Sequence, residues 1–162
     1  MADAFADHLA RLLSLADLSG RLGGDPRVDA SLGDVASLAR IAASADRVSV
    51  FAVENADADA DGPPSITRVA RSVDADDGLR AEVELPVAGA GLLFSAIAGG
   101  SAVSLAPVRA DEPFYASNLA REPLVPGAVA FVPISAGGRA RGVLEAARAD
   151  GRPFSTRDLA AL

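Results

Sequence analysis

The sequence of 162 residues contains no cysteine and no lysine, and it has only one histidine. The absence of cysteine excludes disulfides, thiol nucleophiles, iron–sulfur clusters and cysteine-ligated zinc, since each of these needs sulfur as the donor. The absence of lysine excludes a P-loop phosphate ligand and Schiff-base chemistry. Aspartate, glutamate, hydroxyl groups and one imidazole are therefore the side chains that remain for catalysis.

Positive charge and long apolar runs are also scarce. The chain carries 15 basic residues against 22 acidic ones, a formal net charge of −7, which argues against nucleic acid as a partner. No apolar run approaches the roughly 20 residues of a membrane-spanning helix, and no charged segment followed by an apolar one opens the chain. The sequence predicts one cytoplasmic domain over residues 1–162, with no membrane contact.

Three short motifs resemble known binding sites, and each fails at one position. Residues 57–62 place carboxylates at alternate positions as a calcium loop does, but Arg68 stands where the bidentate glutamate belongs. Residues 89–91 resemble a dinucleotide fingerprint, but Phe94 replaces the third glycine. His8 could serve a catalytic triad only beside a nucleophilic serine, and the sequence has no Gly-x-Ser-x-Gly motif to supply one. An exposed loop, a structural turn and an exposed helix position are the simpler interpretations.

Two helices are expected before the first strand. Residues Ala4 to Leu22 carry apolar side chains at spacings of three and four, and Gly23 to Pro26 would end that helix. A cap at Ser31 to Asp34 predicts a second helix that runs to about Ser44. Its inward face is expected to hold Leu32, Val35, Leu38, Ala39 and Ala42.

Strand patterns alternate with turns through the rest of the chain. Arg47 to Glu54 alternates with a period of two, which predicts one face with Val48, Val50 and Ala52 and another with Ser49, Phe51 and Val53. A short helix at Leu92 to Ala98 should stop at Gly99 and Gly100. Further strands are expected at residues 65–73, 82–87, 102–105, 128–135 and 140–148, with Pro86 marking an edge.

Two connections complete the pattern. Residues 107–126 form a long connection with one helical turn around 114–119, and long structured connections often carry binding residues. Ser155 and Asp158 form a capping-box pattern that opens a final helix. Because that helix reaches only Leu162, about two turns, it reads as the start of a truncated helix over residues 155–162.

The order of these elements resembles the GAF domain family. The resemblance rests on Asp46 to Glu54 (DRVSVFAVE), on residues 85–105 (LPVAGAGLLFSAIAGGSAVSL) and on residues 127–162 (GAVAFVPISAGGRARGVLEAARADGRPFSTRDLAAL). It implies an α+β fold of the GAF/PAS type. In that fold a central antiparallel sheet has the N- and C-terminal helices on one face, and short helices and loops cover a ligand cavity on the other.

The resemblance also implies where a ligand would bind. Four of the seven aromatic residues fall in segments that would border the family's cavity, and three polar residues flank them in the long connection. Core packing for the aromatic residues and surface solvation for the polar ones are the alternative interpretations. The candidate ligand-binding residues are Phe94, Phe114, Tyr115 and Phe131 as walls, with Asp111, Asn118 and Arg121 to orient the ligand.

Known chemistries of the family fit this sequence poorly. Bilin-carrying relatives and relatives that reduce methionine sulfoxide use cysteine, and the signature of cyclic-nucleotide phosphodiesterase relatives needs lysine. The expected function is therefore a non-enzymatic sensory or regulatory domain that binds a small organic ligand of unknown identity. One alternative is a ligand-free dimerisation module. Another is a hydrolase that uses Asp111 and Glu112 beside Arg109.

The terminal helices suggest partners. In the family, such helices pair across a two-fold axis and continue toward an output domain. The residues 1–22 helix shows more apolar surface than one small sheet needs. A homodimer through the first and last helices is expected, within a longer signalling protein. Leu9, Leu12, Leu13 and Leu162 would lie near the contact.

Overall fold

The computed structural model describes residues 26–54, 65–73, 84–86, 91–108, 127–136 and 139–162. The expected helix at 4–22, the loop at 55–64, the turn at 74–78, the helical turn at 114–119 and the glycine pair 137–138 lie outside the described residues. The elements in chain order are α2 (Pro26–Ala42), β1 (Arg47–Glu54), β2 (Ser65–Val73), β3 (Glu84–Pro86), α3 (Gly91–Gly99), β4 (Val103–Leu105), β5 (Ala128–Ala136), β6 (Arg139–Arg148) and α4 (Thr156–Ala160).

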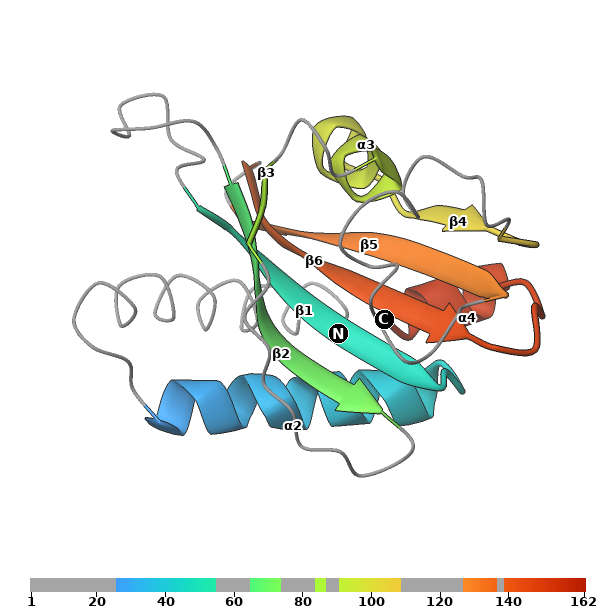
Figure 1. Ribbon diagram of the computed structural model, residues 1–162, viewed down its shortest axis with the longest axis horizontal. Coiled ribbons are helices and arrows are strands. Elements are labelled where there is room, and N and C mark those ends of the chain that lie inside the picture. The colour runs from blue at the N-terminus through green and yellow to red at the C-terminus, as the bar shows by residue number, and fades with distance from the viewer. Residues whose placement is uncertain (1–25, 55–64, 74–83, 87–90, 109–126, 137–138) are drawn as a thin grey trace.

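Within the described part of the chain, six strands form one sheet in the order β3-β2-β1-β6-β5-β4 (Figure 1). Every neighbouring pair is antiparallel. The α+β fold with a central antiparallel sheet is thus confirmed. The strands expected at 47–54 and 65–73 have the predicted bounds, and Pro86 lies in β3, which is an edge strand of the sheet formed by the described residues.

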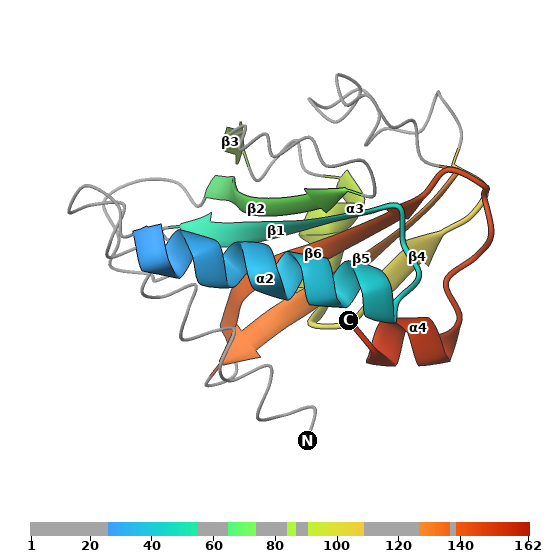
Figure 2. The same cartoon turned by 90° about the horizontal axis from the view of Figure 1, so that it is seen from below.

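The helices form a layer on each side of the sheet. Figure 2 shows α2 and α4 on the near face and α3 behind the strands. Strand β1 is buried on both faces: Val48, Val50 and Ala52 pack in the cluster under α2, whereas Phe51 packs in the cluster under α3. The predicted alternation of β1 is therefore confirmed, and it divides the core into two halves.

The prediction for α2 is wrong at its start and on part of its face. The helix begins at Pro26, a residue that suits the first helical position because its fixed φ is already helical, so Ser31 to Asp34 lie in the helix interior. Leu38 is 63% exposed, and Ala42 is exposed as well. The buried side is made by residues spaced three and four apart that include three alanines, namely Leu32, Val35, Ala36, Ala39 and Ala43.

The helix ends predicted from glycine and serine are confirmed. Gly100 follows α3 with a positive φ of 59°, which glycine adopts without strain. At α4, Asp158 N–H donates to Ser155 Oγ over 3.2 Å, and Ser155 N–H donates to Asp158 Oδ2 over 3.0 Å. This capping box fixes the start of α4. None of the helices in the described residues is long and apolar enough to cross a membrane.

Candidate functional site

The face of the sheet under α3 is the face where the ligand cavity was expected. Helix α3 packs on β4, β5 and β6. Its Leu93 and Ala96 join a cluster with apolar side chains of the three central strands. The buried members from the strands are Phe51, Val129, Phe131, Val143 and Ala147. An apolar wall of this kind is the usual lining of a small-molecule site, in which a few polar groups set the orientation.

Three polar side chains lie on the central strands of this same face. Arg47 and Ser49 alternate with Phe51 along β1, and Glu145 alternates with Val143 and Ala147 along β6, so all point to the α3 side. Arg47 is 1% exposed, and Ser49 and Glu145 are both 0% exposed. Arg47 Nη2 donates to Glu145 Oε1 over 2.5 Å, a buried charge-assisted bond.

The strand register places these groups in one row. Ser49 of β1 lies directly opposite Glu145 of β6, and Glu145 lies directly opposite Phe131 of β5. Directly opposed side chains of antiparallel strands have Cβ atoms roughly 4.5–5.5 Å apart. A hydroxyl, a carboxylate and an aromatic ring therefore stand side by side across three strands.

Two atoms of this row have no hydrogen-bond partner among the described residues. They are Glu145 Oε2 and Ser49 Oγ, and both are fully buried. Leaving a buried polar group without a partner costs about 1–3 kcal/mol, and native proteins do so rarely. Such a cost is understandable where another molecule supplies the missing partner. We therefore define the polar row as Ser49, Glu145 and Phe131, with Arg47 as the counter-ion.

The structure describes two of the seven residues predicted to bind ligand. Phe131 is fully buried in the cluster under α3, whereas Phe94 is 43% exposed on α3 and is not part of that cluster. The other five, Asp111, Phe114, Tyr115, Asn118 and Arg121, lie outside the described residues, as do His8, residues 57–62 and the hydrolase candidates Arg109 and Glu112. No group of three or more histidine, cysteine or acidic residues that could hold a metal occurs in the described ranges.

Sequence reasoning missed the polar row. Its signal was present, because Glu145 is a charge inside a strand whose neighbours on both sides are apolar. A buried strand rarely carries an ionisable residue unless that residue is paired or functional. Glu145 was not predicted because β6 was interpreted only as an apolar strand.

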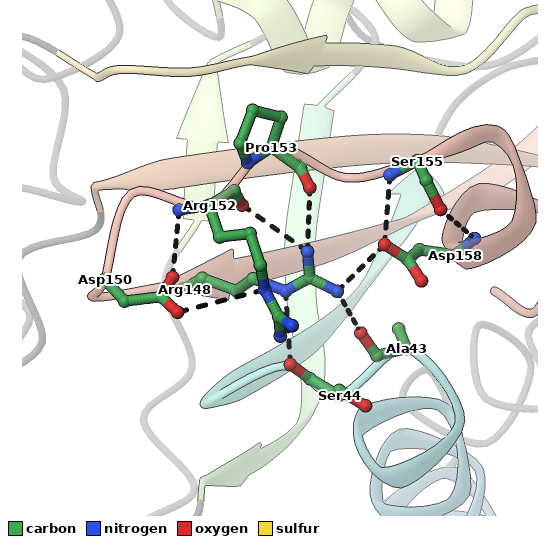
Figure 3. Close-up of polar contacts among 8 residues, drawn as sticks. All are labelled: Ala43, Ser44, Arg148, Asp150, Arg152, Pro153, Ser155 and Asp158. Atoms are coloured by element: carbon green, nitrogen blue, oxygen red, sulfur yellow. Dashed lines mark hydrogen bonds and ion pairs between the residues drawn. The ribbon is translucent and has the colours of Figure 1, made fainter.

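A second buried arginine, Arg148 at the end of β6, lies on the opposite side of the core (Figure 3). It is 2% exposed, and its guanidinium carbon lies 4.0 Å from the centroid of the Phe154 ring. Its five N–H groups are all directed to oxygen acceptors. These are the carbonyls of Ala43, Ser44 at 3.1 Å, Arg152 at 3.4 Å and Pro153 at 2.9 Å, and the Oδ2 of Asp158 at 3.0 Å.

Arg148 is therefore a structural joint. It connects the residues after α2, the turn after β6 and the first turn of α4 (Figure 3). The Ser155 N–H, followed by the Arg148 guanidinium, lowers the pKa of Asp158 below its ordinary value of 3.8. Because every N–H donor of Arg148 already has an acceptor, its guanidinium has no donor left for a ligand.

The comparisons agree with this architecture. A family model described as GAF domain matches residues 27–162. No curated protein sequence matches the chain significantly. Among solved structures, the chain is similar to the type II free methionine-R-sulfoxide reductase from Thermoplasma acidophilum, with 18% identity, 93% of this chain and 86% of that one covered, and a TM-score of 0.62.

Two further solved structures are similar to the chain. The GAF domain of a phosphoenolpyruvate-protein phosphotransferase from Coxiella burnetii has 17% identity over 96% of this chain and 86% of that one, with a TM-score of 0.61. The NreA protein from Staphylococcus aureus, altered in its nitrate binding site, has 20% identity over 80% and 88%, with a TM-score of 0.55. At these identities the likeness establishes a shared fold.

Proposed function

Because the chain belongs to the GAF domain family, we propose that it is a non-enzymatic sensory or regulatory domain that binds a small organic ligand over the α3 face of its sheet. The observation that carries the proposal is the polar row, where two buried atoms have no partner among the described residues. Its wall residues would include Phe131 and Phe94. Phe114 and Tyr115 would complete the wall, and Asp111, Asn118 and Arg121 would orient the ligand.

Similar structures support a small-molecule role. The NreA protein has a nitrate binding site, and the Thermoplasma acidophilum protein is a free methionine-R-sulfoxide reductase. The second likeness raises the alternative of an enzyme. Family members that reduce methionine sulfoxide use cysteine, and this chain has none, so thiol-based reduction is not available to it. Binding without turnover is the function that its residues favour.

The second part of the proposal is a homodimer through the terminal helices, within a longer protein that has an output domain. The outer face of α2 would extend that contact, because its Leu38 and Ile41 are 63% and 66% exposed and lie one turn apart. Leu9, Leu12, Leu13 and Leu162 would lie near the contact. Leu162 itself packs in part against the core of its own chain, so we expect it at the rim of such a contact.

Thermal unfolding of the whole chain against nucleotides, amino acids and organic acids tests the proposal. A ligand at about 100 times its Kd should stabilise the folded state by about 2.7 kcal/mol. The stabilisation should fall in Ser49→Ala and persist in Arg152→Gln, because the Arg152 side chain is 60% exposed and lies outside the site. Sedimentation of the same samples over a concentration series reports the oligomeric state.

Two results would count against the proposal. If no compound in the panel raises the unfolding midpoint, or if Ser49→Ala leaves every shift unchanged, the polar row does not bind the ligand. If the chain sediments as a monomer at all concentrations, the dimer is wrong while the ligand site stands.

A further inference from the structure

We propose that residues 4–22 fold back beside α2 and cover β5 and β6 on the face of the sheet opposite α3. These residues lie outside the described ranges, so the proposal is carried by the described side chains that they would cover. It goes beyond the ligand site, and it refines the dimer part of the proposed function, because it gives the first helix a contact within its own chain. Since α3 packs on the other face of β5 and β6, the first helix and the proposed ligand face would share these two strands.

Strands β5 and β6 are deeply buried on this face. Their side chains there belong to the same cluster as those of α2. Leu144 is 1% exposed and Ile134 is 3% exposed, and the smaller members are 0% exposed. The smaller members are Ala128, Ala130 and Ala146. A layer of atoms must therefore lie over both strands along most of their length.

The described helices supply only part of that layer. Helix α2 packs on β2 and β1, the other half of the face. Leu159 in α4 and Leu162 after it also pack against the cluster. Figure 2 shows α4 at one end of the sheet and the arrowhead of β5 toward the other end, below α2 and crossed by neither helix. The end of β5 therefore needs a cover from another part of the chain.

Residues 4–22 suit this position by their attachment and by their apolar stripe. Only residues 23–25 separate them from Pro26, where α2 begins, and helices joined by so short a connection lie antiparallel and side by side. The tether also keeps them at an effective concentration of about millimolar, which favours their own sheet over that of a second chain. The stripe consists of Phe5, Leu9, Leu12, Leu13 and Ala16, and Leu15, Leu18 and Leu22 widen it on the side left for a second chain.

The direction of α2 fixes which part of the first helix meets which part of β5. Arg47 at the start of β1 lies opposite Ala147, and Ala147 lies opposite Val129 near the start of β5. Because α2 leads into β1, its end lies near the start of β5 and its beginning lies toward the end of β5, as Figure 2 shows. An antiparallel first helix therefore places Ser19 toward the end of β5 and His8 toward its start.

Two other segments outside the described ranges fit this position less well. Residues 55–64 contain no apolar side chain larger than proline. Residues 109–126 begin and end at the start of β5, where Val108 N–H donates to Gly127 O over 2.8 Å. They are thus attached at the opposite end of β5 from the part that needs a cover.

The first experiment measures how fast one introduced thiol reacts with an alkylating reagent, since the chain has no cysteine of its own. Ile134→Cys reports on the end of β5, and Val35→Cys reports on the contact between α2 and the sheet. Adding Leu12→Asp with Leu13→Asp should speed the first reaction at least about tenfold and leave the second unchanged, because only the cover of β5 opens. Unchanged reactivity of Ile134→Cys, or equal acceleration at both positions, overturns the proposal.

The second experiment leaves the stripe intact and measures proximity by NMR. A nitroxide attached to Ser19→Cys in the isotope-labelled full chain should broaden the amide signal of Ile134 more than that of Val129, and a nitroxide on His8→Cys should reverse the order. An equal mixture of nitroxide-bearing unlabelled chains and isotope-labelled chains without nitroxide should show far less broadening. Broadening in the mixture as strong as within one chain would assign the cover to a second copy. That result, or broadening within one chain that is absent or equal at the two ends of β5, overturns the proposal.

These outcomes are separate from those of the proposed function. Failure of the proposal leaves the ligand site untouched, because stabilisation by a ligand depends on the α3 face of the sheet. A chain that sediments as a dimer without the expected broadening keeps the homodimer and loses this contact. A monomer with the expected broadening keeps this contact and loses the homodimer.

Discussion

Two buried arginines among the described residues, Arg47 and Arg148, lie in different surroundings. Arg148 is 2% exposed, and each of its five N–H groups has an oxygen acceptor. Arg47 is 1% exposed and pairs with Glu145, but that carboxylate and the neighbouring Ser49 each keep an atom without a partner among the described residues. The first centre is fully bonded, whereas Glu145 Oε2 and Ser49 Oγ beside the second have no partner among the described residues.

The difference comes from what each arginine meets. Four of the acceptors around Arg148 are backbone carbonyls, two of them just beyond the end of α2. Carbonyls at a helix end have no partner within the helix, and a cation there also interacts well with the helix dipole. Arg47 instead pairs with a side chain, the Glu145 carboxylate of the neighbouring strand β6.

The largest effect is expected from Arg148→Met. The change leaves several carbonyls and the Asp158 carboxylate without their hydrogen-bond donor. The free energy of unfolding should therefore fall by about 3–5 kcal/mol, as when one partner of a buried pair is removed. Urea unfolding measures it. Arg152→Met is the control, and at 60% side-chain exposure it should cost at most about 0.5 kcal/mol. Similar losses of unfolding free energy in both variants would show that Arg148 does not act as a structural joint.

A smaller effect is expected at the other arginine. Glu145→Leu removes the partner of Arg47 and should cost about 3 kcal/mol, whereas the double variant Arg47→Leu with Glu145→Leu should recover much of that loss. The coupling comes from a double-mutant cycle in urea. The same cycle on Arg152 and Asp150, an exposed pair at 3.9 Å, should give coupling near zero. Additive costs at Arg47 and Glu145 would mean that the pair does not act as a unit.

The smallest effect is expected in the stability of the fold at acidic pH. Because the pKa of Asp158 in the folded chain is below 3.8, its carboxylate contributes stability above that pH, and the contribution is lost as the pH falls through the folded pKa. Asp158→Asn should therefore lower Tm at pH 7, and the gap to the wild type should close between about pH 4 and pH 2. Calorimetry at several pH values measures this gap. A gap that stays constant with pH would assign the loss to packing instead.

The sequence predicted most of the sheet because its signals are local. The period of two in Arg47 to Glu54 gave β1 its bounds and both its faces, and Ser155 with Asp158 gave α4 its cap. It predicted the buried side of α2 only in part: Leu32, Val35 and Ala39 are buried as expected, whereas Leu38 is exposed. Leu38 and Ala36 both fit an apolar stripe, and close packing on the sheet selected the alanine.

Chain order and local chemistry thus determined the elements, the turns and the family likeness. Tertiary structure alone decided what lies side by side. Ser49 and Glu145 are 96 positions apart in the chain, and only the β1–β6 register makes them neighbours. Likewise, Gly127 must be glycine because an added Cβ would lie 2.6 Å from the nitrogen of Gly151. Sequence patterns report each residue's preference for helix, strand or turn, whereas burial, partners and missing partners depend on which distant segments the sheet brings together.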